Sequence, residues 1–468
     1  MQLIIQNFGP IKDGKIDFSK KFFVFVGYNN SGKTYMSQLL WAIFNEETIE
    51  KFSQSVEFEE LIIEKPGTFE INPTLIENIL AKFAGFLISD IIPKTFNLNR
   101  EHFHNIFLDF QYDINRIKRK SLNVKFARDD KAFFVFSKEK NSLMITIEEK
   151  SFSNAVFSFF ENGRKSSELV EFVLRLLFDN LHQTVFLPAS RLFYLIFYQY
   201  IYRLEKEKRQ KMTQRVREYL HNDNSNKTHL ESLLSSFKSP YTESMNWLFD
   251  KIYGLNESAV VKSHYEALIA ELTRIMEGDI VMRKSEGIAP IEFYLKMLKP
   301  NKKLPMYLSS SSVNQLSTLY LYFKYWANPK NNFLMIDEPE ENLHPKNQMA
   351  LLNVLLKFAN ENDNRVLITT HSPFLADMIN NYLYLAFLKS KSVSISHQME
   401  NYPEMNLDID LMVEDIGIYF FDGDQIKTYQ MGEYGVLFED FNYEIRKSHK
   451  IRDLLTDQIY CLINNNDD

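Results

Sequence analysis

One octet of the sequence, residues 27–34, constrains the fold more than any other segment. It reads Gly27-Tyr-Asn-Asn-Ser-Gly-Lys-Thr34 and fits the pattern G-x-x-x-x-G-K-[ST]. The apolar run 22–26 predicts a short buried strand before it, and residues 35–44 predict a helix after it. A glycine-containing turn between a strand and a helix points backbone N–H groups and the helix dipole at an anion. The octet therefore predicts a phosphate-binding loop, and a chance match in a Gly/Asn turn is the alternative.

The same pattern gives expected roles to individual residues of this loop. Lys33 would reach the β- and γ-phosphates of a nucleotide, and the Thr34 hydroxyl would bind Mg²⁺. The residues that we expect to contact ATP are Gly27, Asn29, Asn30, Ser31, Gly32, Lys33 and Thr34.

Length and composition narrow the class of protein. A chain of 468 residues has room for about three domains. The net charge of −7 excludes a global basic field that would attract DNA. Cys461 is the only cysteine, which excludes a disulfide framework and a cysteine-based metal site. Neither a signal peptide nor an apolar run of about 18 residues is found, so we expect a cytoplasmic protein without membrane contact.

The order of elements predicts an α/β fold: a P-loop head with a mixed sheet, an antiparallel sheet and a large, mostly helical insertion. We divide the chain into an N-terminal lobe, a helical insertion, a C-terminal lobe, and a final hairpin and helix: 1–190, 191–278, 279–400 and 401–468.

Periodicity predicts further detail within these segments. Residues 45–118 are expected to be mostly helical. Strands at 132–136, 143–147 and 155–159 predict an antiparallel meander. The dipeptide Asp422-Gly423 predicts the turn of a hairpin.

A pair of acidic residues with a possible catalytic role follows the apolar run 332–336. Asp337 and Glu338 come at the end of this predicted buried strand. An acid at the tip of a strand beside a phosphate loop is the Walker B arrangement. Asp337 would hold Mg²⁺, and Glu338 would orient and deprotonate the attacking water. Two acids at the end of a strand without such a role are common, and this is the alternative.

Two segments resemble ABC-type ATPases of the SMC, RecF and OLD kind. Asp337-Glu-Pro-Glu-Glu-Asn-Leu-His-Pro345 resembles their Walker B and D-loop, and Val366-Leu-Ile-Thr-Thr-His-Ser-Pro373 resembles their last core strand with its switch histidine. The resemblance implies that His371 contacts the γ-phosphate and that Asn342 belongs to the D-loop. Without it, a histidine at a strand end is more often structural. The long separation between Lys33 and Asp337 suits a head that is split by an insertion.

The serine run before Walker B resembles the signature motif of the same family. This motif reaches across a dimer to the γ-phosphate on the other subunit, and the resemblance assigns it to Ser310, Ser311, Ser312 and Gln315. The family usually has a glycine in this motif, where this chain has Ser312. Ordinary capping of a helix by serine is the alternative.

The sequence leaves the roles of several other residues unresolved. Phe8 or Lys12 could border the adenine, or they are a core residue and a surface residue. Arg191 either points toward the nucleotide or a partner, or is a surface residue in a turn. Gln183 is a weak candidate for the Q-loop glutamine. The basic clusters 116–120 and 203–217 are either solvated helix faces, which we favour, or contacts to nucleic acid or an acidic partner.

The family resemblance also implies a biological role. OLD nucleases carry a Toprim domain, whose metal site needs a Glu-Gly pair followed by an Asp-x-Asp motif. Asp422-Gly-Asp424 has the second pattern, but no matching Glu-Gly precedes it, and we interpret it as a hairpin turn. We therefore expect no nuclease activity. The chain resembles ATPase subunits of anti-phage systems such as Septu, PARIS and retron-associated ATPases. This implies slow ATP hydrolysis, a homo-oligomer, a separate nuclease or toxin as effector, and a nucleic acid or phage protein as trigger. A RecF-like DNA repair ATPase and an ATP-bound scaffold are the alternatives.

Overall fold

The computed structural model describes residues 1–464 with gaps. The residues left out are 57–66, 128–131, 152–164, 182, most of 198–240, parts of 256–262, 285–290, and parts of 394–404 and of 431–442.

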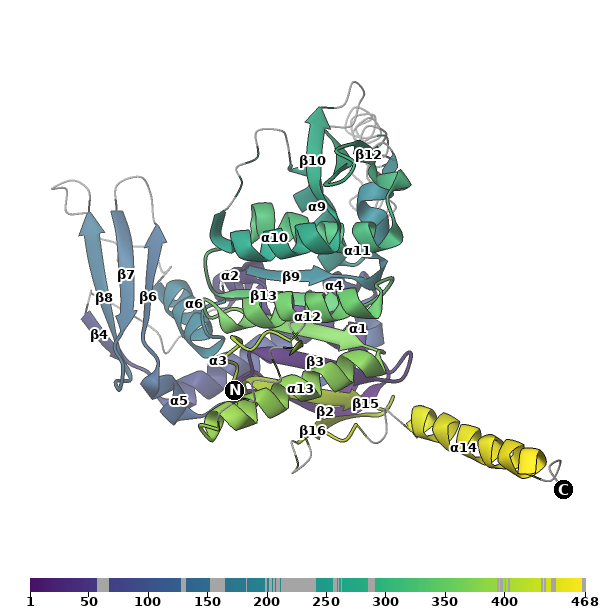
Figure 1. Cartoon of the computed structure of the whole chain (residues 1–468). Coiled ribbons are helices and arrows are strands. Elements are labelled where there is room, and N and C mark those ends of the chain that lie inside the picture. Colours follow the sequence, from purple (N-terminus) through teal and green to yellow (C-terminus); the bar gives the residue numbers. More distant parts are fainter. Residues whose placement is uncertain are drawn as a thin grey trace.

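A nine-stranded mixed sheet forms the centre of the molecule, in the order β5-β1-β2-β16-β15-β3-β14-β13-β9 (Figure 1). Its strands are β1 (Gln2–Phe8), β2 (Ile11–Asp17), β3 (Phe22–Gly27), β5 (Phe107–Gln111), β9 (Gln183–Leu187), β13 (Asn332–Asp337), β14 (Arg365–Thr370), β15 (Ile416–Phe421) and β16 (Gln425–Tyr429). The five strands from β15 to β9 are parallel, whereas β5, β1 and β2 pair with one another antiparallel. Strand β16 is parallel to β2 and antiparallel to β15. The predicted α/β fold with a mixed sheet is confirmed.

The parallel strands are buried on both faces. Every residue of β3, β13 and β14 is buried, as expected for apolar strands that helices cover on both sides. Alternate side chains of β3 enter different cores: Phe23 and Phe25 one, and Phe22, Val24 and Val26 the other.

Two groups of helices contribute to these two cores. The first core includes side chains from α1 (Lys33–Phe44), α2 (Glu46–Ser55), α3 (Pro73–Phe86), α4 (Ile92–Phe96), α5 (Ile114–Arg119) and α6 (Lys165–Leu177). The second includes side chains from α9 (Glu243–Tyr253), α10 (Glu266–Ile275), α11 (Ser311–Leu321), α12 (Pro345–Asn360) and α13 (Pro373–Ser390). Figure 1 shows α12 and α13 packed across the sheet.

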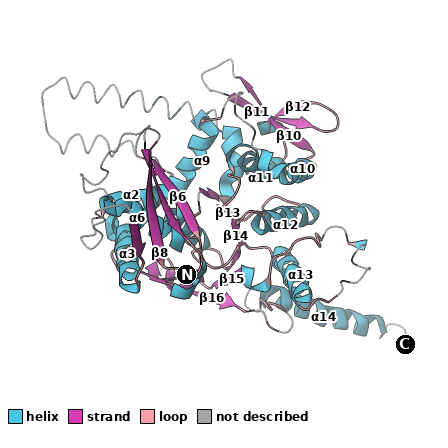
Figure 2. Ribbon diagram, turned by 90° about the vertical axis from the view of Figure 1, so that its left-hand side faces the viewer, coloured by secondary structure: helices cyan, strands magenta, loops and turns pink. Residues whose placement is uncertain are grey.

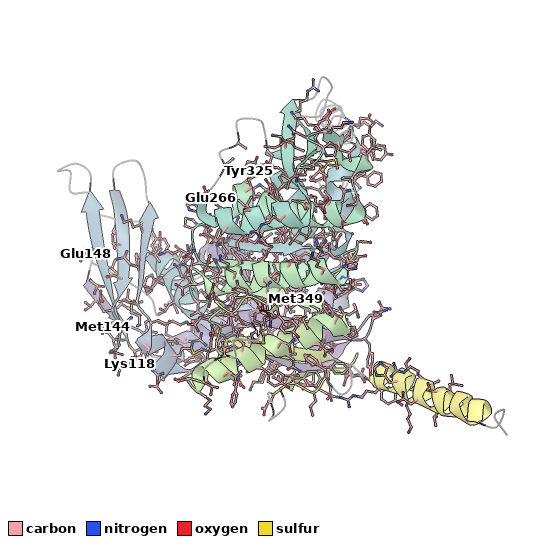
Figure 3. All side chains as sticks on the ribbon, viewed as in Figure 1. Lys118, Met144, Glu148, Glu266, Tyr325 and Met349 are labelled. Carbon is pink, nitrogen blue, oxygen red and sulfur yellow. The ribbon has the colours of Figure 1, made fainter. Side chains whose placement is uncertain are left out.

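A separate antiparallel sheet stands beside the first core, in the order β4-β8-β7-β6 (Figure 1). Its strands β6 and β8 are labelled in the turned view of Figure 2. Its strands are β4 (Gly67–Glu70), β6 (Leu122–Ala127), β7 (Ala132–Lys138) and β8 (Met144–Ser151). Met144 and Glu148 of β8 are labelled in Figure 3. The predicted strands at 132–136 and 143–147 are confirmed, and the one at 155–159 lies outside the described residues. The mostly helical prediction for 45–118 is wrong at β4 and β5, because these short strands form only by pairing with β8 and β1.

The insertion and the C-terminal segment complete the described fold. Helices α9 and α10 lie in the predicted insertion 191–278. The antiparallel sheet of β10 (Gly278–Lys284), β11 (Ile291–Met297) and β12 (Lys303–Pro305) lies, apart from Gly278, in the segment predicted as the C-terminal lobe. The predicted hairpin at Asp422-Gly423 is confirmed, and it lies inside the central sheet because β15 pairs with β3. The final helix α14 (Tyr443–Asn464) extends away from that sheet in Figure 1. Among the described residues, no helix has both the length and the hydropathy that a membrane crossing requires.

Candidate active site

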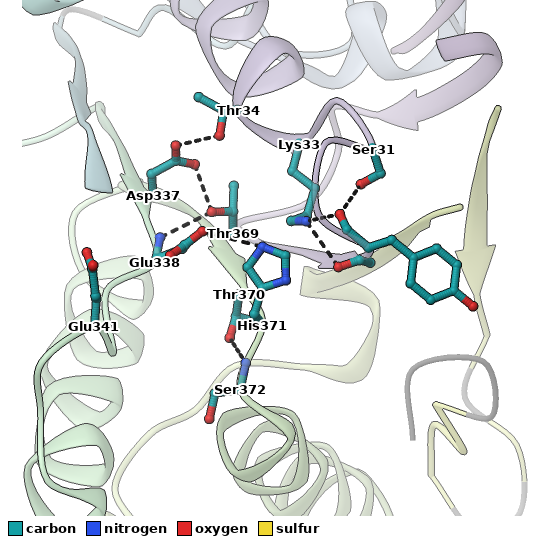
Figure 4. Close-up of polar contacts among 12 residues, drawn as sticks. Ser31, Lys33, Thr34, Asp337, Glu338, Glu341, Thr369, Thr370, His371 and Ser372 are labelled. Carbon is teal, nitrogen blue, oxygen red and sulfur yellow. Dashed lines mark hydrogen bonds and ion pairs between the residues drawn. The ribbon is translucent and has the colours of Figure 1, made fainter. Parts of the chain in front are cut away.

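Three adjacent parallel strands bring the predicted site residues to one edge of the sheet. β3 ends at Gly27, β13 at Asp337 and β14 at Thr370, and β14 lies between the other two. The carboxyl ends of parallel strands are where open α/β sheets bind ligands. Figure 4 shows that the phosphate loop, the acidic pair and the histidine, which are distant in sequence, face one another there.

The loop between β3 and α1 has the backbone that its glycines predict. Gly27 has φ 143°, and an added Cβ would lie 2.1 Å from the Phe421 carbonyl oxygen. Gly32 caps α1 with φ 97°, so the helix begins at Lys33 with its N-terminus at the loop. Asn29 and Asn30 are exposed at the tip of the loop. The strand and the helix predicted around the octet are therefore confirmed.

Lys33 lies inside this loop. Its Nζ donates to the carbonyl oxygens of Gly27 at 3.1 Å and Tyr28 at 2.7 Å, and the Ser31 hydroxyl donates to Tyr28 at 2.7 Å. Burial lowers the pKa of Lys33 to about 8, although three nearby carboxylates oppose this shift. The lysine is thus largely protonated at neutral pH and placed where a phosphate would meet the loop.

Asp337 is the centre of a network of hydroxyl groups (Figure 4). The hydroxyls of Thr34 and Thr369 donate to its two carboxylate oxygens at 2.6 and 2.7 Å. Thr369 in turn accepts from the backbone N–H of Glu338 at 3.1 Å. Burial raises the pKa of Asp337, whereas both threonine hydroxyls act to lower it. The network fixes the carboxylate directly against the first turn of α1.

This donor set fits Mg²⁺. One carboxylate and one hydroxyl, Asp337 and Thr34, lie within hydrogen-bonding distance of each other. Magnesium prefers oxygen ligands and takes one or two carboxylates, with water and substrate phosphates in the remaining positions. An ion held by these two residues would neutralise charge on the phosphates of a nucleotide.

Glu338 and His371 form a second pair of predicted site residues. The His371 Nε2 lies 3.4 Å from the Glu338 Oε1, and both side chains are partly exposed. The hydrogen bond from His371 lowers the pKa of Glu338. A second acid, Glu340, accepts from the backbone N–H of His371 at 3.2 Å and fixes the end of β14. Glu338 is therefore a partly exposed carboxylate directly after Asp337, where it could accept a proton from water.

Arg191 is a residue whose role the sequence did not resolve. It is 1% exposed, so the surface interpretation is wrong. Its guanidinium donates to the backbone oxygens of Asp337, Glu338 at 3.0 Å, Gln315 at 3.1 Å and Pro188 at 3.1 Å. Burial lowers its pKa to about 10, so the group stays charged at neutral pH. Arg191 thus joins the acidic strand end to the helix that follows the serine run.

The serine run lies at the N-terminus of α11. Ser310 is the N-cap and accepts from the Val313 N–H at 3.3 Å, as ordinary capping predicts. Ser310 and Ser311 are exposed, and Ser312 is partly exposed. Gln315 is fully buried and donates to Ala189 and Glu341. A side chain without exposed surface cannot reach a second subunit, so we restrict the signature hypothesis to the three serines.

The structure also places the remaining candidates. Asn342 is exposed, with φ 61°, in the turn after Walker B. Phe8 is a buried core residue, and Lys12 forms an exposed ion pair with Asp424. The Q-loop candidate Gln183 is the first residue of the edge strand β9 and pairs with Asn332, the first residue of β13. It therefore lies at the ends of the strands that are remote from the phosphate loop. That assignment is therefore wrong.

Comparisons with known proteins identify the family. The curated proteins contain no match to the chain. Two solved structures are similar to it at 11% identity: an Smc head domain with an extended coiled coil bound to the C-terminal domain of ScpA from Pyrococcus furiosus (TM-score 0.32, covering 97% of this chain and 98% of that one), and an SmcHead bound to the C-winged helix domain of ScpA (TM-score 0.34, covering 92% and 98%). At this sequence identity and these TM-scores the two structures carry no argument, and the fold is assigned from the strand order given above. The model of the AAA ATPase domain family matches residues 1–376. The chain therefore belongs to the AAA ATPase domain family.

Proposed function

We propose that this protein binds ATP with Mg²⁺ and hydrolyses it slowly at an interface between two copies of the chain. The observation that carries the proposal is the convergence of Lys33, Asp337, Glu338 and His371 at one edge of the sheet. The phosphate loop and Lys33 bind the phosphates, and Thr34 and Asp337 hold the metal. Glu338 takes a proton from the attacking water, and His371 orients that carboxylate and reaches toward the γ-phosphate.

A second copy would complete this site. Ser310–Ser312 present hydroxyls and a helix N-terminus to the outside, where they suit a γ-phosphate bound by another subunit. Tyr307 and Leu308, directly before them, are 68% and 59% exposed. Exposed apolar side chains beside an anion-binding helix end support an interface at this position. Asn342 is exposed as well and is assigned to the same interface.

We further propose that the nucleotide state gates a separate effector, a nuclease or a toxin, in bacterial anti-phage defence. Resemblance of the motifs to ATPase subunits of such systems supports this role. A plaque assay with the chain expressed together with its neighbouring genes tests it. Protection that is lost with Lys33→Ala supports the role, and equal plaque counts with and without the intact genes would refute it.

Replacing Glu338 by glutamine tests the site itself. Glu338→Gln keeps the size of the side chain but removes the base, so kcat should fall roughly 100-fold while ATP still binds. The variant should accumulate as an ATP-bound dimer in size-exclusion chromatography with light scattering. Glu414→Gln, remote from the site, is the matched control. Turnover at the parent rate by Glu338→Gln would show that the base is assigned wrongly.

Two measurements separate the alternatives. Phosphate release by the parent that Lys33→Ala abolishes excludes a scaffold that stores ATP without turnover. Salt-sensitive, ATP-dependent binding of duplex DNA by the isolated chain would favour a RecF-like repair ATPase.

A further inference from the structure

A cavity lies at the amino-terminal ends of the central parallel strands, whereas the phosphate loop lies at their carboxyl ends. Its volume is about 550 Å³, which is in the range of small-ligand sites. Lys21, Asn331 and Arg365 line it, and these residues lie at or just before the first residues of β3, β13 and β14. The active site lies at the other ends of the same six-residue strands, roughly 20 Å away. Helix α5, which Lys118 marks in Figure 3, forms part of the opposite wall.

Positive charge dominates this cavity. Eight lysine and arginine side chains line it, against two carboxylates, Asp179 and Asp363. Two of the eight, Lys21 and Arg175, also pair with acids outside the lining, which leaves six cations against the two carboxylates. The chain as a whole has a net charge of −7, so this concentration of cations does not follow from composition. A recess lined by one sign of charge focuses its field and attracts counter-ions.

The inner part of the cavity is built around Asp179. Arg116, Lys120 and Arg365 all form ion pairs with this one carboxylate. Burial would raise the pKa of Asp179, but the three cations together hold it well below its usual range. The Arg365 side chain is only 7% exposed, and its Nη1 has no hydrogen-bond partner within the described part of the chain. The cluster therefore keeps a net positive charge and an unused buried donor.

The rim adds three cations without an ion pair to any acid in the described part of the chain. Arg119 ends α5, Lys140 follows β7, and Lys330 precedes β13, so three separate segments bring them together. All three are exposed, and none forms an ion pair with another described residue. The sequence interpretation of 116–120 as a solvated helix face is therefore wrong for Arg116 and Lys120, which pair with the partly buried Asp179.

We propose that this cavity binds a small polyphosphate anion, such as the phosphate chain of a nucleoside polyphosphate or free inorganic polyphosphate. Guanidinium and ammonium groups at several depths match an anion with contiguous phosphates. The bounded volume favours a small ligand, because nucleic acid requires a stripe of cations along several phosphates of a backbone. The site is separate from ATP hydrolysis and does not depend on the effector proposed above.

Isothermal titration calorimetry with inorganic tripolyphosphate tests the site. The full chain is first given a single equivalent of AMP-PNP, with Mg²⁺ in excess over all phosphate, so that the phosphate loop is filled and the cavity stays free. The parent should then bind one further equivalent of tripolyphosphate. Titrations with GTP and with a single-stranded DNA 20-mer distinguish a nucleotide, a free polyphosphate and a nucleic acid as sources of the phosphates.

The rim cations provide the decisive variant. The triple change Arg119→Ala, Lys140→Ala and Lys330→Ala affects only exposed side chains and should weaken tripolyphosphate binding roughly tenfold or more. The matched control removes three exposed positive charges from the turn after β11 and the first residue of β12: Lys299→Ala, Lys302→Ala and Lys303→Ala. This control should bind like the parent, and both triples should keep AMP-PNP binding.

A second variant acts in the opposite direction. Asp363 lines the cavity with φ 54°, a conformation that asparagine also tolerates. Asp363→Asn should therefore fold normally and tighten tripolyphosphate binding about two- to threefold. Absence of the additional equivalent, equal affinity in the two triples, or binding of the DNA without binding of tripolyphosphate or GTP would each overturn the proposal.

Discussion

Arg191 shows how one buried side chain can organise an active site. Four backbone oxygens accept from its guanidinium, and two of them belong to Asp337 and Glu338. The planar fork of arginine fits several acceptors at fixed angles, which a lysine ammonium cannot reproduce. We therefore regard Arg191 as a positioning residue for the proposed metal ligand, Asp337, and the proposed base, Glu338.

Replacing Arg191 by lysine tests that role. Arg191→Lys keeps the charge but leaves buried carbonyl groups without donors, so the free energy of unfolding should fall by about 2–3 kcal/mol. Steady-state kinetics should show kcat reduced at least roughly tenfold with KM for ATP little changed. Arg274→Lys, at an exposed ion pair, is the control. An Arg191→Lys protein with parental stability and kcat would contradict the role.

Asp179 is a second single residue with a testable effect, because its charge makes the stability of the fold depend on pH. Its folded-state pKa is depressed, so its contribution to stability is complete above its unfolded pKa of about 3.9 and is lost as the pH falls below that value. Asp179→Asn should lower the free energy of unfolding by roughly 1–3 kcal/mol at pH 7. In thermal melts from pH 7 to pH 3, the difference from the parent should shrink only below about pH 4.

The control for this pH series is Asp453→Asn, because that carboxylate is exposed on α14. Its melting temperature should follow the parent at every pH. A constant difference between Asp179→Asn and the parent down to pH 3 would show that Asp179 does not stabilise the fold through its charge.

At the scale of elements, strand β14 and helix α11 decide how the site is assembled. β14 separates β3 from β13 and places Thr369 against Asp337 and His371 against Glu338. Helix α11 presents its capped N-terminus outward while its interior is buried. Ser310 caps this helix, whereas Ser311 is exposed and does not serve as the cap, so substitutions at these two residues can separate capping from the proposed role in trans.

Two substitutions in α11 separate these roles. Ser310→Ala removes the cap and should cost about 1 kcal/mol of stability. Ser311→Arg places a bulky cation on the exposed helix end, so stability should change little, whereas ATP-dependent dimerisation and phosphate release should be lost. Light scattering with ATP and a phosphate-release assay measure the two effects. A Ser311→Arg dimer with parental turnover would refute the role in trans.

At the scale of the whole molecule, the proposed site is shared between two chains. The phosphate loop, acids and histidine of one copy would face Ser310–Ser312 of another. In a dimer with two-fold symmetry, each interface contains two such sites. A defect in the loop and a defect in the serine run can therefore compensate each other across the interface.

Mixing two inactive variants tests this arrangement. Lys33→Ala keeps an intact serine run, and Ser311→Arg keeps an intact phosphate loop. In an equimolar mixture half of the dimers should be mixed, each with one intact site, which restores about one quarter of the parent rate. Phosphate release after co-incubation measures this recovery. A mixture as inactive as its components would indicate that hydrolysis does not use a second subunit.

Local patterns in the sequence were sufficient for the core of the site. The strand-loop-helix around Lys33, the acidic end of β13, the strand before His371 and the hairpin at Asp422 depend on apolar runs and turn residues, which act over short segments. These elements are therefore found where the sequence predicts them.

Only the tertiary structure decided which distant segments meet. β4 and β5 exist because another strand pairs with them, and Gln183 lies at the remote edge because of its register with β13. Burial of Arg191 and Gln315, and the cavity around Asp179, require several segments to converge. Pairing and burial depend on contacts between residues far apart in the chain, and a local pattern carries no information about them. The phosphate loop was thus determined by the sequence, and its surroundings by the fold.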